Sequence, residues 1–448
     1  MIGDPPASTA SPKTRKRFAS WAGSAWRSVG LAQRAMRTAV RVAEIDTRLL
    51  GMLGALLVIW VVFHFASGDW HWSQGTFLTP RNLWNLSVQT TVVAIMATGM
   101  VLVIVSRNID LSVGSVLGAV GLVMAMLQAK WLPELLGFDH WATWIIALAA
   151  GLLMGAAIGG LHGFVVAYVG VPSFIVTLGG LLAWRGVAWW TTRGQTIAPM
   201  DSTFQLLGGG SRGNIGGFWS WIVGGVACGG IVLMLLNGRR RRSKFGLKLR
   251  SLWVEIALGA LYCGVVLGAI SYLNRYYLPE RVAAARGGGN IPFGLANPVL
   301  ILIGVTLVMV FISTRLRFGR YVFAIGGNPE AAVLSGIKTR ATILKTFVLM
   351  GFLVAVAAAV QTARLNAGTS GLGQTAELYV IAAAVIGGTS LAGGIGTATG
   401  AVLGALVMQS LQSGMVLIGV EAPIQDVAAG IVLVFAVALD TILKRRPK

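Results

Sequence analysis

The stretch RFGRYVFAIGGNPEAAVLSGI, Arg317 to Ile337, is a polar, helix-forming island between two long apolar segments. Within it, Asn328 is a good N-cap, Pro329 suits the first helical position, and Glu330 lies where the helix dipole favours a carboxylate. Gly336 supplies a C-terminal stop. The stretch therefore predicts a short capped helix that lies outside a membrane while its neighbours cross it.

The apolar side of this short helix is small. Ala331, Ala332 and Leu334, with Ser335 and Ile337 after them, offer too little surface to anchor a membrane but enough to fill a groove on a partner. An ordinary surface helix between two spans is the alternative that composition alone favours.

The composition of the whole chain supports a membrane protein. Of 448 residues, 55% are hydrophobic and 11% are charged, whereas an ordinary globular domain has about 25% charged residues. The apolar runs repeatedly approach or exceed the ~20 residues that cross a hydrocarbon core of ~30 Å. We therefore expect an all-α polytopic membrane protein.

We expect twelve spans, with the count falling to ten or eleven if one segment is broken or re-entrant. The segment 379–392 is short and leads into the glycine-rich stretch Gly387 to Gly400, which makes it the candidate for such a break. The expected spans are residues 49–67, 86–106, 111–129, 142–168, 173–193, 218–236, 252–273, 296–314, 343–362, 379–392, 398–417 and 424–443.

The basic residues indicate the orientation. With the first span leaving the cytoplasm, the inside segments hold 27 Lys and Arg and the outside loops hold eight, as the positive-inside rule requires. Both termini are then cytoplasmic: residues 1–48 form a basic tail, 49–443 the transmembrane domain and 444–448 a short basic tail. A removable signal peptide fits poorly, because the apolar run from Leu49 is long enough to remain as a span.

The excess of 36 Lys and Arg over 15 Asp and Glu does not indicate nucleic-acid binding. These basic residues lie in short blocks beside apolar spans, so they are better explained by membrane orientation. Cys228 and Cys263 both lie in apolar segments and suggest neither a disulfide nor a thiolate metal site. No P-loop, zinc-protease or serine-elbow motif occurs, so we expect no ATPase site, no metal and no cofactor.

The 60 glycines are expected to serve helix packing. Gly151, Gly155, Gly159 and Gly163 repeat at four-residue spacing, as do Gly400 and Gly404, and small residues at this spacing let helix backbones approach each other. A sliding seam during gating is the alternative function. GSVLGAV at Gly114 and GAVLGAL at Gly400 are alike, either through internal duplication or by coincidence.

A few ionisable residues lie within or beside spans, where a charge costs at least ~2.5 kcal/mol on insertion scales. Asp110 follows Arg107 in NIDLSVG and is expected to be a helix N-cap at a cytoplasmic turn. Arg185 could snorkel outward, pair with Glu377 or line a polar path. Glu255 and Asp426 lie near span ends, which disfavours a proton-coupled transporter.

Five motifs occur in an order that identifies a known family. They are GMVLVIVSRNIDLSVGSVLG (99–118), VPSFIVTLGGLLAWRG (171–186), the RFGR stretch above, ELYVIAAAVIGGTSLAGGIGTATGAVLGA (377–405) and QDVAAGIVLVFAVALD (425–440). From about Thr79 to Arg445 the chain resembles the membrane permeases of sugar-importing ATP-binding-cassette (ABC) systems of the ribose, xylose and galactose type. It looks most like the xylose type, because an inserted pair of spans, 218–273 with the basic loop 237–250, precedes the RFGR motif.

The resemblance implies a homodimer of permeases with a type II ABC importer fold in the bacterial inner membrane. Two cytoplasmic ATPase subunits would dock on the coupling loop 315–345 through Asn328 to Ile337, and a periplasmic sugar-binding protein would deliver a monosaccharide such as D-xylose. Expected path residues are Asn108, Asp110, Thr177, Arg185, Gln361, Thr389, Ser390, Gly393 and Gly394. Expected contacts for the binding protein are Arg193, Arg212, Arg275, Arg281 and Arg286.

Two other classes compete with this interpretation. A secondary transporter or channel would work without ATPase subunits, and co-purification with such subunits would exclude it. A membrane-embedded enzyme would need a convergent nucleophile, base or metal cluster, and the motifs contain none.

Overall fold

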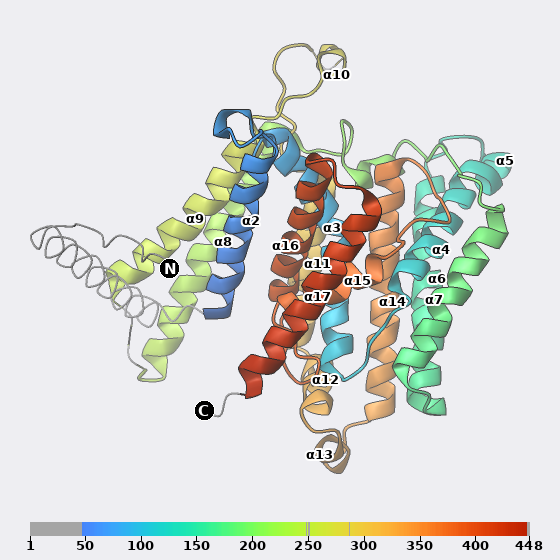
Figure 1. Cartoon of the computed structure of the whole chain (residues 1–448), viewed down its shortest axis with the longest axis vertical. Helices are drawn as coiled ribbons and strands as arrows, with labels where there is room; N and C mark the ends of the chain where they lie inside the picture. The colour runs from blue at the N-terminus through green and yellow to red at the C-terminus, as the bar shows by residue number, and fades with distance from the viewer. Residues whose placement is uncertain (1–46, 248, 250, 286, 446–448) are drawn as a thin grey trace, which may run out of the picture.

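The computed structural model describes residues 47–445 except 248, 250 and 286, and every regular element within them is a helix (Figure 1). The expected basic tail lies outside the described residues except for its last two positions. Residues 446–448 of the C-terminal tail and Arg286 also lie outside them.

The helices follow the expected spans closely. Their bounds are α2 Thr47–Ala66, α3 Pro80–Val105, α4 Val113–Met126, α5 Leu132–Leu136, α6 Thr143–Phe164, α7 Ser173–Thr192, α8 Gly216–Lys244, α9 Leu252–Leu273, α10 Glu280–Ala284, α11 Asn297–Thr314, α12 Arg317–Gly327, α13 Pro329–Leu334, α14 Thr339–Leu365, α15 Ala376–Ile386, α16 Ala398–Leu417 and α17 Ala422–Arg445. Short π-helical turns, 127–131 and 165–169, extend α4 into α5 and lengthen α6.

Eight helices of the described residues are long and apolar enough to cross a membrane. The part of α2 from Leu50, α15, and the part of α17 up to Phe435 are shorter apolar helices. The 20-residue α7 falls outside both groups. The all-helical architecture with several spans is thus confirmed, whereas the segment 379–392 is not a continuous span. With 11 residues, α15 is roughly 16 Å long and cannot cross ~30 Å alone.

Helix α3 forms the centre of the bundle. Thr79 caps its first turn by accepting a hydrogen bond from the Asn82 N–H at 3.4 Å, and Pro80 follows at the first helical position. From Val92 to Val105 every residue is buried, because α14, α15, α16 and α11 all pack on this helix.

The predicted glycine seams are confirmed as helix-packing surfaces. Gly155 and Gly159 lie against the backbone of α14, where an added Cβ would meet Gly351 and Phe347 carbonyl oxygens. Gly400 and Gly404 lie in the same way against Gly387 and Ala383. The seams bring α6 onto α14 and α16 onto α15 at backbone contact.

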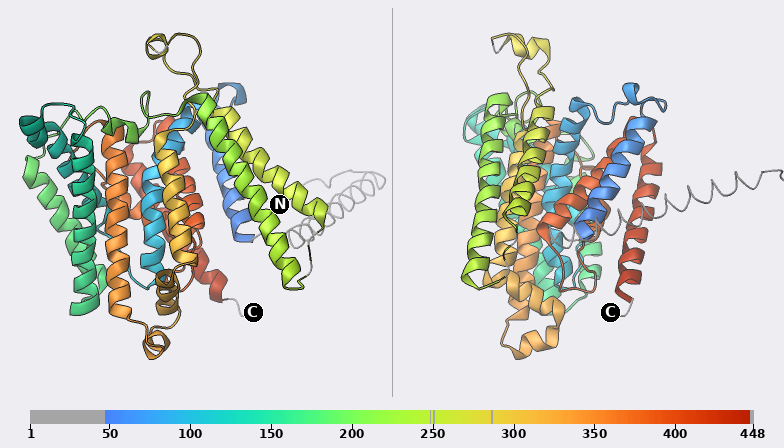
Figure 2. Two further views of the ribbon diagram at one scale, coloured as in Figure 1. Left: turned by 180° about the vertical axis from the view of Figure 1, so that it is seen from behind. Right: turned by 90° about the vertical axis from the view of Figure 1, so that its left-hand side faces the viewer.

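The helical bundle has two ends that carry different short helices. The α10 face carries α10, and the α13 face carries α12 and α13 (Figure 1). The start of α2 and the end of α17 both lie toward the α13 face in Figures 1 and 2. The pair α8–α9 stands at one edge of the bundle and leans away from the other helices toward the α13 face.

Candidate functional site

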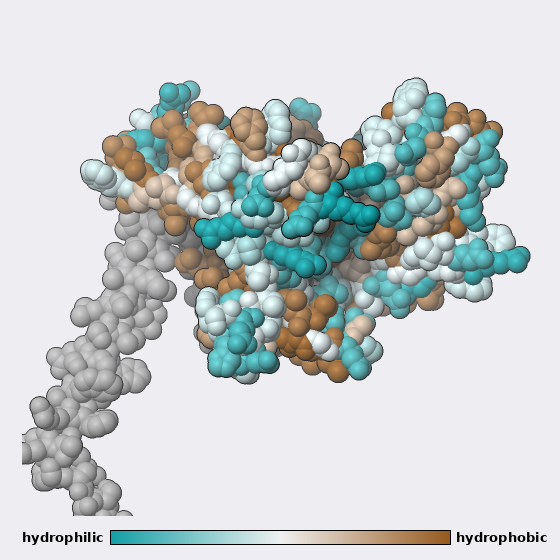
Figure 3. All heavy atoms as spheres, turned by 90° about the horizontal axis from the view of Figure 1, so that it is seen from above, coloured by the Kyte–Doolittle hydropathy of each residue, from teal (hydrophilic) through white to brown (hydrophobic). Residues whose placement is uncertain are grey.

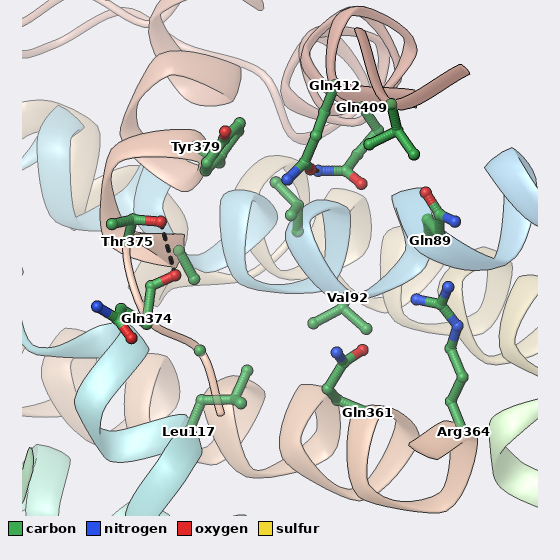
Figure 4. A pocket seen from close by; sticks show the side chains of 14 residues that line it. Gln89, Val92, Leu117, Gln361, Arg364, Gln374, Thr375, Tyr379, Gln409 and Gln412 are labelled. Carbon is green, nitrogen blue, oxygen red and sulfur yellow. Dashed lines mark hydrogen bonds between the residues drawn. The ribbon is translucent and has the colours of Figure 1, made fainter. Parts of the chain in front are cut away.

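A polar cavity of about 300 Å³ lies between α3, α14, α15 and α16. Its lining residues include side chains of α3, α14 and α16, in the halves of these helices that lie toward the α10 face. Figure 4 shows Gln89, Gln361 and Arg364 directed into the same open space as the neighbouring Gln409 and Gln412. The lining residues are Gln89, Val92, Val93, Leu117, Gln361, Arg364, Gly373, Gln374, Thr375, Ala376, Tyr379, Gln409, Gln412 and Val416.

The chemistry of this wall suits a neutral molecule with several hydroxyl groups. Each glutamine amide both donates and accepts hydrogen bonds, and Arg364 adds further donors. The Gln409 amide already donates to Gln412 Oε1 at 2.9 Å, which leaves the remaining amide groups for a guest. The Tyr379 hydroxyl is buried and has no hydrogen-bond partner among the described residues.

The α10 face is hollowed between larger lobes, and strongly hydrophilic side chains gather around the hollow (Figure 3). Gln89 lies near the start of α3, whereas Arg364 and Gln412 lie near the ends of α14 and α16. Since these three helix ends point to the same face, the cavity is nearer to the α10 face than to the α13 face.

On the side of the cavity toward the α13 face, two partly buried non-helical segments interrupt the helices. The first, residues 106–112, joins α3 to α4 and runs along α7. The Ile109 N–H donates to Ser173 Oγ at 3.2 Å, and the Thr177 hydroxyl donates to the Ile109 carbonyl at 3.3 Å. The Asn108 amide donates to the Ser106 carbonyl at 3.0 Å. Asn108 and Thr177 thus satisfy the backbone of the interruption, as a non-helical segment at this depth requires.

The expectation that Asp110 is a helix N-cap is wrong. Ser112 occupies the N-cap position of α4, and Asp110 Oδ1 accepts hydrogen bonds from the Ser112 N–H at 2.9 Å and hydroxyl at 2.6 Å. The carboxylate therefore closes a local turn two residues before the N-cap of α4. Ser112 Oγ also lies 3.2 Å from His162 Nδ1, and Trp184 Nε1 donates to His162 Nε2 at 3.1 Å.

The second interruption, residues 387–397, joins α15 to α16. The Gly394 N–H donates to the Val105 carbonyl at 3.0 Å, which ties this segment to the end of α3. Gly393 and Gly394 have φ values of 88° and 77°, a region that favours glycine. Thr389 and Ser390 are buried within the segment. These four expected path residues therefore lie in a close-packed junction and not among the residues that line the cavity.

Arg107 connects both interruptions to the α13 face. Its Nε donates to the Gly326 carbonyl at 2.8 Å, and its Nη2 donates to the Gly327 carbonyl at 3.0 Å. These carbonyls end α12, where the helix dipole favours a cation. The side chain of Arg107 also borders Gly393, because an added Cβ there would meet Arg107 Cγ at 2.6 Å.

Helix α13 follows directly and has the predicted caps. Asn328 Oδ1 accepts from the Ala331 N–H at 3.0 Å, with Pro329 at the first helical position. Leu334 is 88% exposed, as a docking residue should be, whereas Ala332 is only 4% exposed. Ala332 thus packs inward, and Val333, which the motif does not select, is 58% exposed beside Leu334.

Arg185 and Glu377 each have a buried polar atom in the interior. Arg185 lies within electrostatic range of the Glu377 carboxylate. Among the described residues, neither Arg185 Nη2 nor Glu377 Oε2 has a hydrogen-bond partner, although both atoms are buried. Gly114 leaves room for the carboxylate, which a Cβ at that position would overlap. Among the described residues no ion pair within 4.0 Å joins Arg185 to Glu377, so none of the three roles considered for Arg185 is established.

The expected loop arginines gather at the α10 face. Arg193 ends α7, Arg275 follows α9 and lies over the Tyr272 ring, and Arg281 belongs to α10. Arg212 lies within electrostatic range of Asp139, whose pKa is lowered chiefly by the hydrogen bond from the Ser202 N–H.

Nearby in the same loops, Asp201 accepts hydrogen bonds from the N–H groups of Thr203 and Phe204. Burial raises the pKa of Asp201. The pKa of Asp139 is therefore below the usual value for a carboxyl group, and the pKa of Asp201 is above it.

Of the nine expected path residues, Gln361 lines the cavity. Asn108, Asp110 and Thr177 lie together at the first interruption, and Thr389, Ser390, Gly393 and Gly394 at the second. Gln89, Gln409 and Gln412 are not selected by any motif, although isolated glutamines near the ends of apolar helices were a usable signal. Arg107 was visible only as one basic residue among many.

A family model described as "Branched-chain amino acid transport system / permease component" matches residues 82–437. The xylose transport system permease protein XylH of Haemophilus influenzae is 40% identical over 406 residues, covering 91% of this chain and 99% of that protein. XylH of Escherichia coli K12 is 39% identical over 403 residues, covering 90% and 94%.

The ribose import permease protein RbsC of Escherichia coli K12 is 32% identical over 364 residues, covering 81% of this chain and 87% of that protein. No solved structure matches the chain.

Proposed function

This chain belongs to the family of branched-chain amino acid transport system permease components. From its similarity to a xylose permease, we propose that it imports D-xylose or a related pentose. It is the membrane permease of an ABC sugar importer and has no ATPase site of its own. The observation that carries the proposed substrate is the 40% identity to a xylose permease over 91% of the chain. A cavity lined by amides suits a neutral sugar, since its hydroxyl groups need both donors and acceptors.

The proposed assembly is a homodimer with a type II importer fold in the bacterial inner membrane. Each permease would cross the membrane twelve times, with α15 and the interruption after it forming one broken crossing within the domain 49–443. The α13 face would be cytoplasmic, because the end of α8, helix α12 and the start of α14 lie on that side (Figure 1) and carry or adjoin the basic residues Arg240, Arg315, Arg320, Lys338 and Arg340. Both termini would then be cytoplasmic.

The partners are proposed at opposite faces. ATPase subunits would dock on Asn328 to Ile337 within the coupling loop 315–345, and a periplasmic sugar-binding protein would dock on the α10 face. Sugar would enter the cavity from that face and leave when the interruptions 106–112 and 387–397 separate. Asn108, Asp110, Thr177, Arg185, Thr389 and Ser390 would then border the lower path.

The experiment is uptake of labelled D-xylose into proteoliposomes that contain the permease, its ATPase and its binding protein. We expect uptake of labelled xylose to require both ATP and the binding protein. Unlabelled ribose or galactose should compete only weakly with this uptake. The double variant Gln361→Leu and Gln409→Leu should assemble normally but transport slowly, while Leu135→Ala, an exposed position on the α10 face, serves as the matched control.

The rival function is a secondary transporter or channel. Xylose uptake driven by an ion gradient in proteoliposomes that lack the ATPase would support that rival and overturn the proposal. ATP-dependent uptake of another sugar, with xylose excluded, would retain the importer but reject the substrate.

A further inference from the structure

The α8–α9 hairpin has more exposed apolar surface than its place in the bundle requires. The two helices pack along each other, and α9 also approaches α3. In the most apolar 18-residue stretch of each helix, only 11% of α8 and 17% of α9 are buried. Met234 is 78% and Trp253 79% exposed, so the hairpin would meet lipid on most sides.

A groove lies between the two helices in the half nearer the α13 face. Its volume is about 400 Å³, and its wall is almost entirely apolar. Gly259 keeps the groove open, because a Cβ there would already lie 3.2 Å from Leu235 Cδ1. The apolar lining includes Val232, Leu236, Leu252, Ile256, Gly259 and Ala260.

An ion pair closes the polar end of the groove. Arg239 Nη1 lies 2.8 Å from Glu255 Oε2, and both residues line the groove. This pair compensates the negative charge of Glu255. The basic residues that follow on α8 therefore create a net positive charge at this end.

Those basic residues lie at headgroup depth. Helix α8 has 29 residues and is roughly 44 Å long, which exceeds a hydrocarbon core of ~30 Å. Arg240, Arg241 and Lys244, in its last two turns, are exposed. The apolar groove therefore lies at the membrane depth of a lipid acyl chain. The basic cluster lies next to it along α8, at the depth of the lipid headgroup.

We propose that this hairpin binds one anionic phospholipid of the leaflet at the α13 face. One acyl chain occupies the groove, and the phosphate is held by Arg240, Arg241 and Lys244. Charge complementarity selects this occupant, because clustered basic residues beside a membrane helix attract anionic headgroups. The positive-inside rule alone would explain the basic residues at the end of α8. It would not explain why an apolar groove ends beside them.

The test uses the full-length permease purified in detergent and titrated with palmitoyl-oleoyl phosphatidylglycerol or the matching phosphatidylcholine. Native mass spectrometry counts the lipids that stay bound, and thermal unfolding measures stabilisation. We expect phosphatidylglycerol to bind about tenfold more tightly than phosphatidylcholine and to raise the unfolding midpoint, since several basic residues face one headgroup. Glycerophosphoglycerol, which has no acyl chains, should not compete.

Two variants locate the site. Arg240→Gln with Arg241→Gln and Lys244→Gln should abolish the preference for phosphatidylglycerol, and Gly259→Leu should weaken binding of both lipids by filling the groove. The matched control is Arg315→Gln with Lys338→Gln and Arg340→Gln, which removes three exposed charges from the same face and should keep the preference.

Equal binding of the two lipids by the unchanged protein would overturn the proposal, and this measurement needs no variant to fold. A preference that survives the triple variant at α8, or that disappears equally in the control, would place the headgroup elsewhere. A change of oligomeric mass in Gly259→Leu would show that a protein surface, not a lipid, covers the groove.

Discussion

Arg107 joins three segments that are far apart in the chain. Its backbone has a left-handed φ of 63°, and its guanidinium donates to the carbonyls of Gly326 and Gly327. Hydrogen bonds to charged groups contribute about 1.5–3 kcal/mol each. Because α13 begins two residues after Gly327, a displacement of α13 must pull on Arg107 and thus on the first interruption.

We expect Arg107→Gln to uncouple ATP hydrolysis from transport. The complex should assemble, and the binding protein should still stimulate hydrolysis, but sugar imported per ATP should fall about tenfold or more, because the variant loses both charged hydrogen bonds to α12. Arg107→Lys keeps the charge but loses the planar pair of donors and should be intermediate. Arg81→Gln, exposed at the other end of α3 and outside the coupling loop, is the control. A normal ratio of sugar to ATP in Arg107→Gln would exclude this role.

Two glycines of the second interruption allow the effect of backbone strain to be tested apart from the effect of a steric contact. Gly388 has a φ of 91° with nothing within 4 Å of an added Cβ, whereas a Cβ on Gly394 would lie 3.1 Å from the Gly327 backbone. Gly388→Ala should therefore cost about 1–2 kcal/mol in stability from strain alone and retain transport. Gly394→Ala should lose transport as well. Thermal unfolding and uptake measured on both variants decide this, and equal uptake would show that the contact with α12 is unimportant.

At the scale of elements, capping residues were the strongest sequence signal. Asn328 and Pro329 predicted α13 within a residue, and each expected span except 379–392 coincides with a helix. The glycine-rich stretch from Gly387 to Gly400 marked the broken segment after α15, but hydropathy alone did not give the residue at which the helix ends. Hydropathy also missed the start of α3, where Thr79 and Pro80 begin the helix in a polar stretch.

Leu334→Asp in α13 should prevent productive docking of the ATPase. The side chain is 88% exposed, so the permease itself should fold, and the new charge would have to be buried in an apolar groove of the partner. Co-purification of the ATPase and xylose uptake are the measurements. Leu135→Asp in α5, 79% exposed on the opposite face, is the matched control. Full uptake by Leu334→Asp would mean that another surface receives the ATPase.

At the scale of the whole molecule, the cavity depends on residues that the chain brings together from four helices. Gln89, Gln361, Gln409 and Gln412 are scattered polar residues in largely apolar helices, and no local pattern indicates that they meet. Gln361 was predicted without knowledge of its neighbours. The rest of the wall follows from the close approach of α15 to α16 and from the position of α3 at the centre.

The α10 face should attract its binding protein electrostatically. Replacing Arg193, Arg212 and Arg281 by Gln should slow association at low ionic strength, and the difference from wild type should shrink as salt shortens the screening length to about 8 Å at 0.15 M. Stopped-flow association across a salt series measures this. Gln at Arg315, Lys338 and Arg340 on the other face should leave the rate unchanged. A salt-independent difference would point to direct contacts instead of steering.

The junction of Gly326, Gly394 and Val105 has a consequence for the energy of the cell. Main chains meet there without intervening side chains, so rotamer changes cannot open it, and whole segments must part together. An idle permease would then leak few ions, and the proton-motive force across the membrane would be preserved between turnovers. Dye-based proton leak into proteoliposomes should be at background for the wild type and higher for Gly394→Ala, and an equal leak would place the barrier elsewhere.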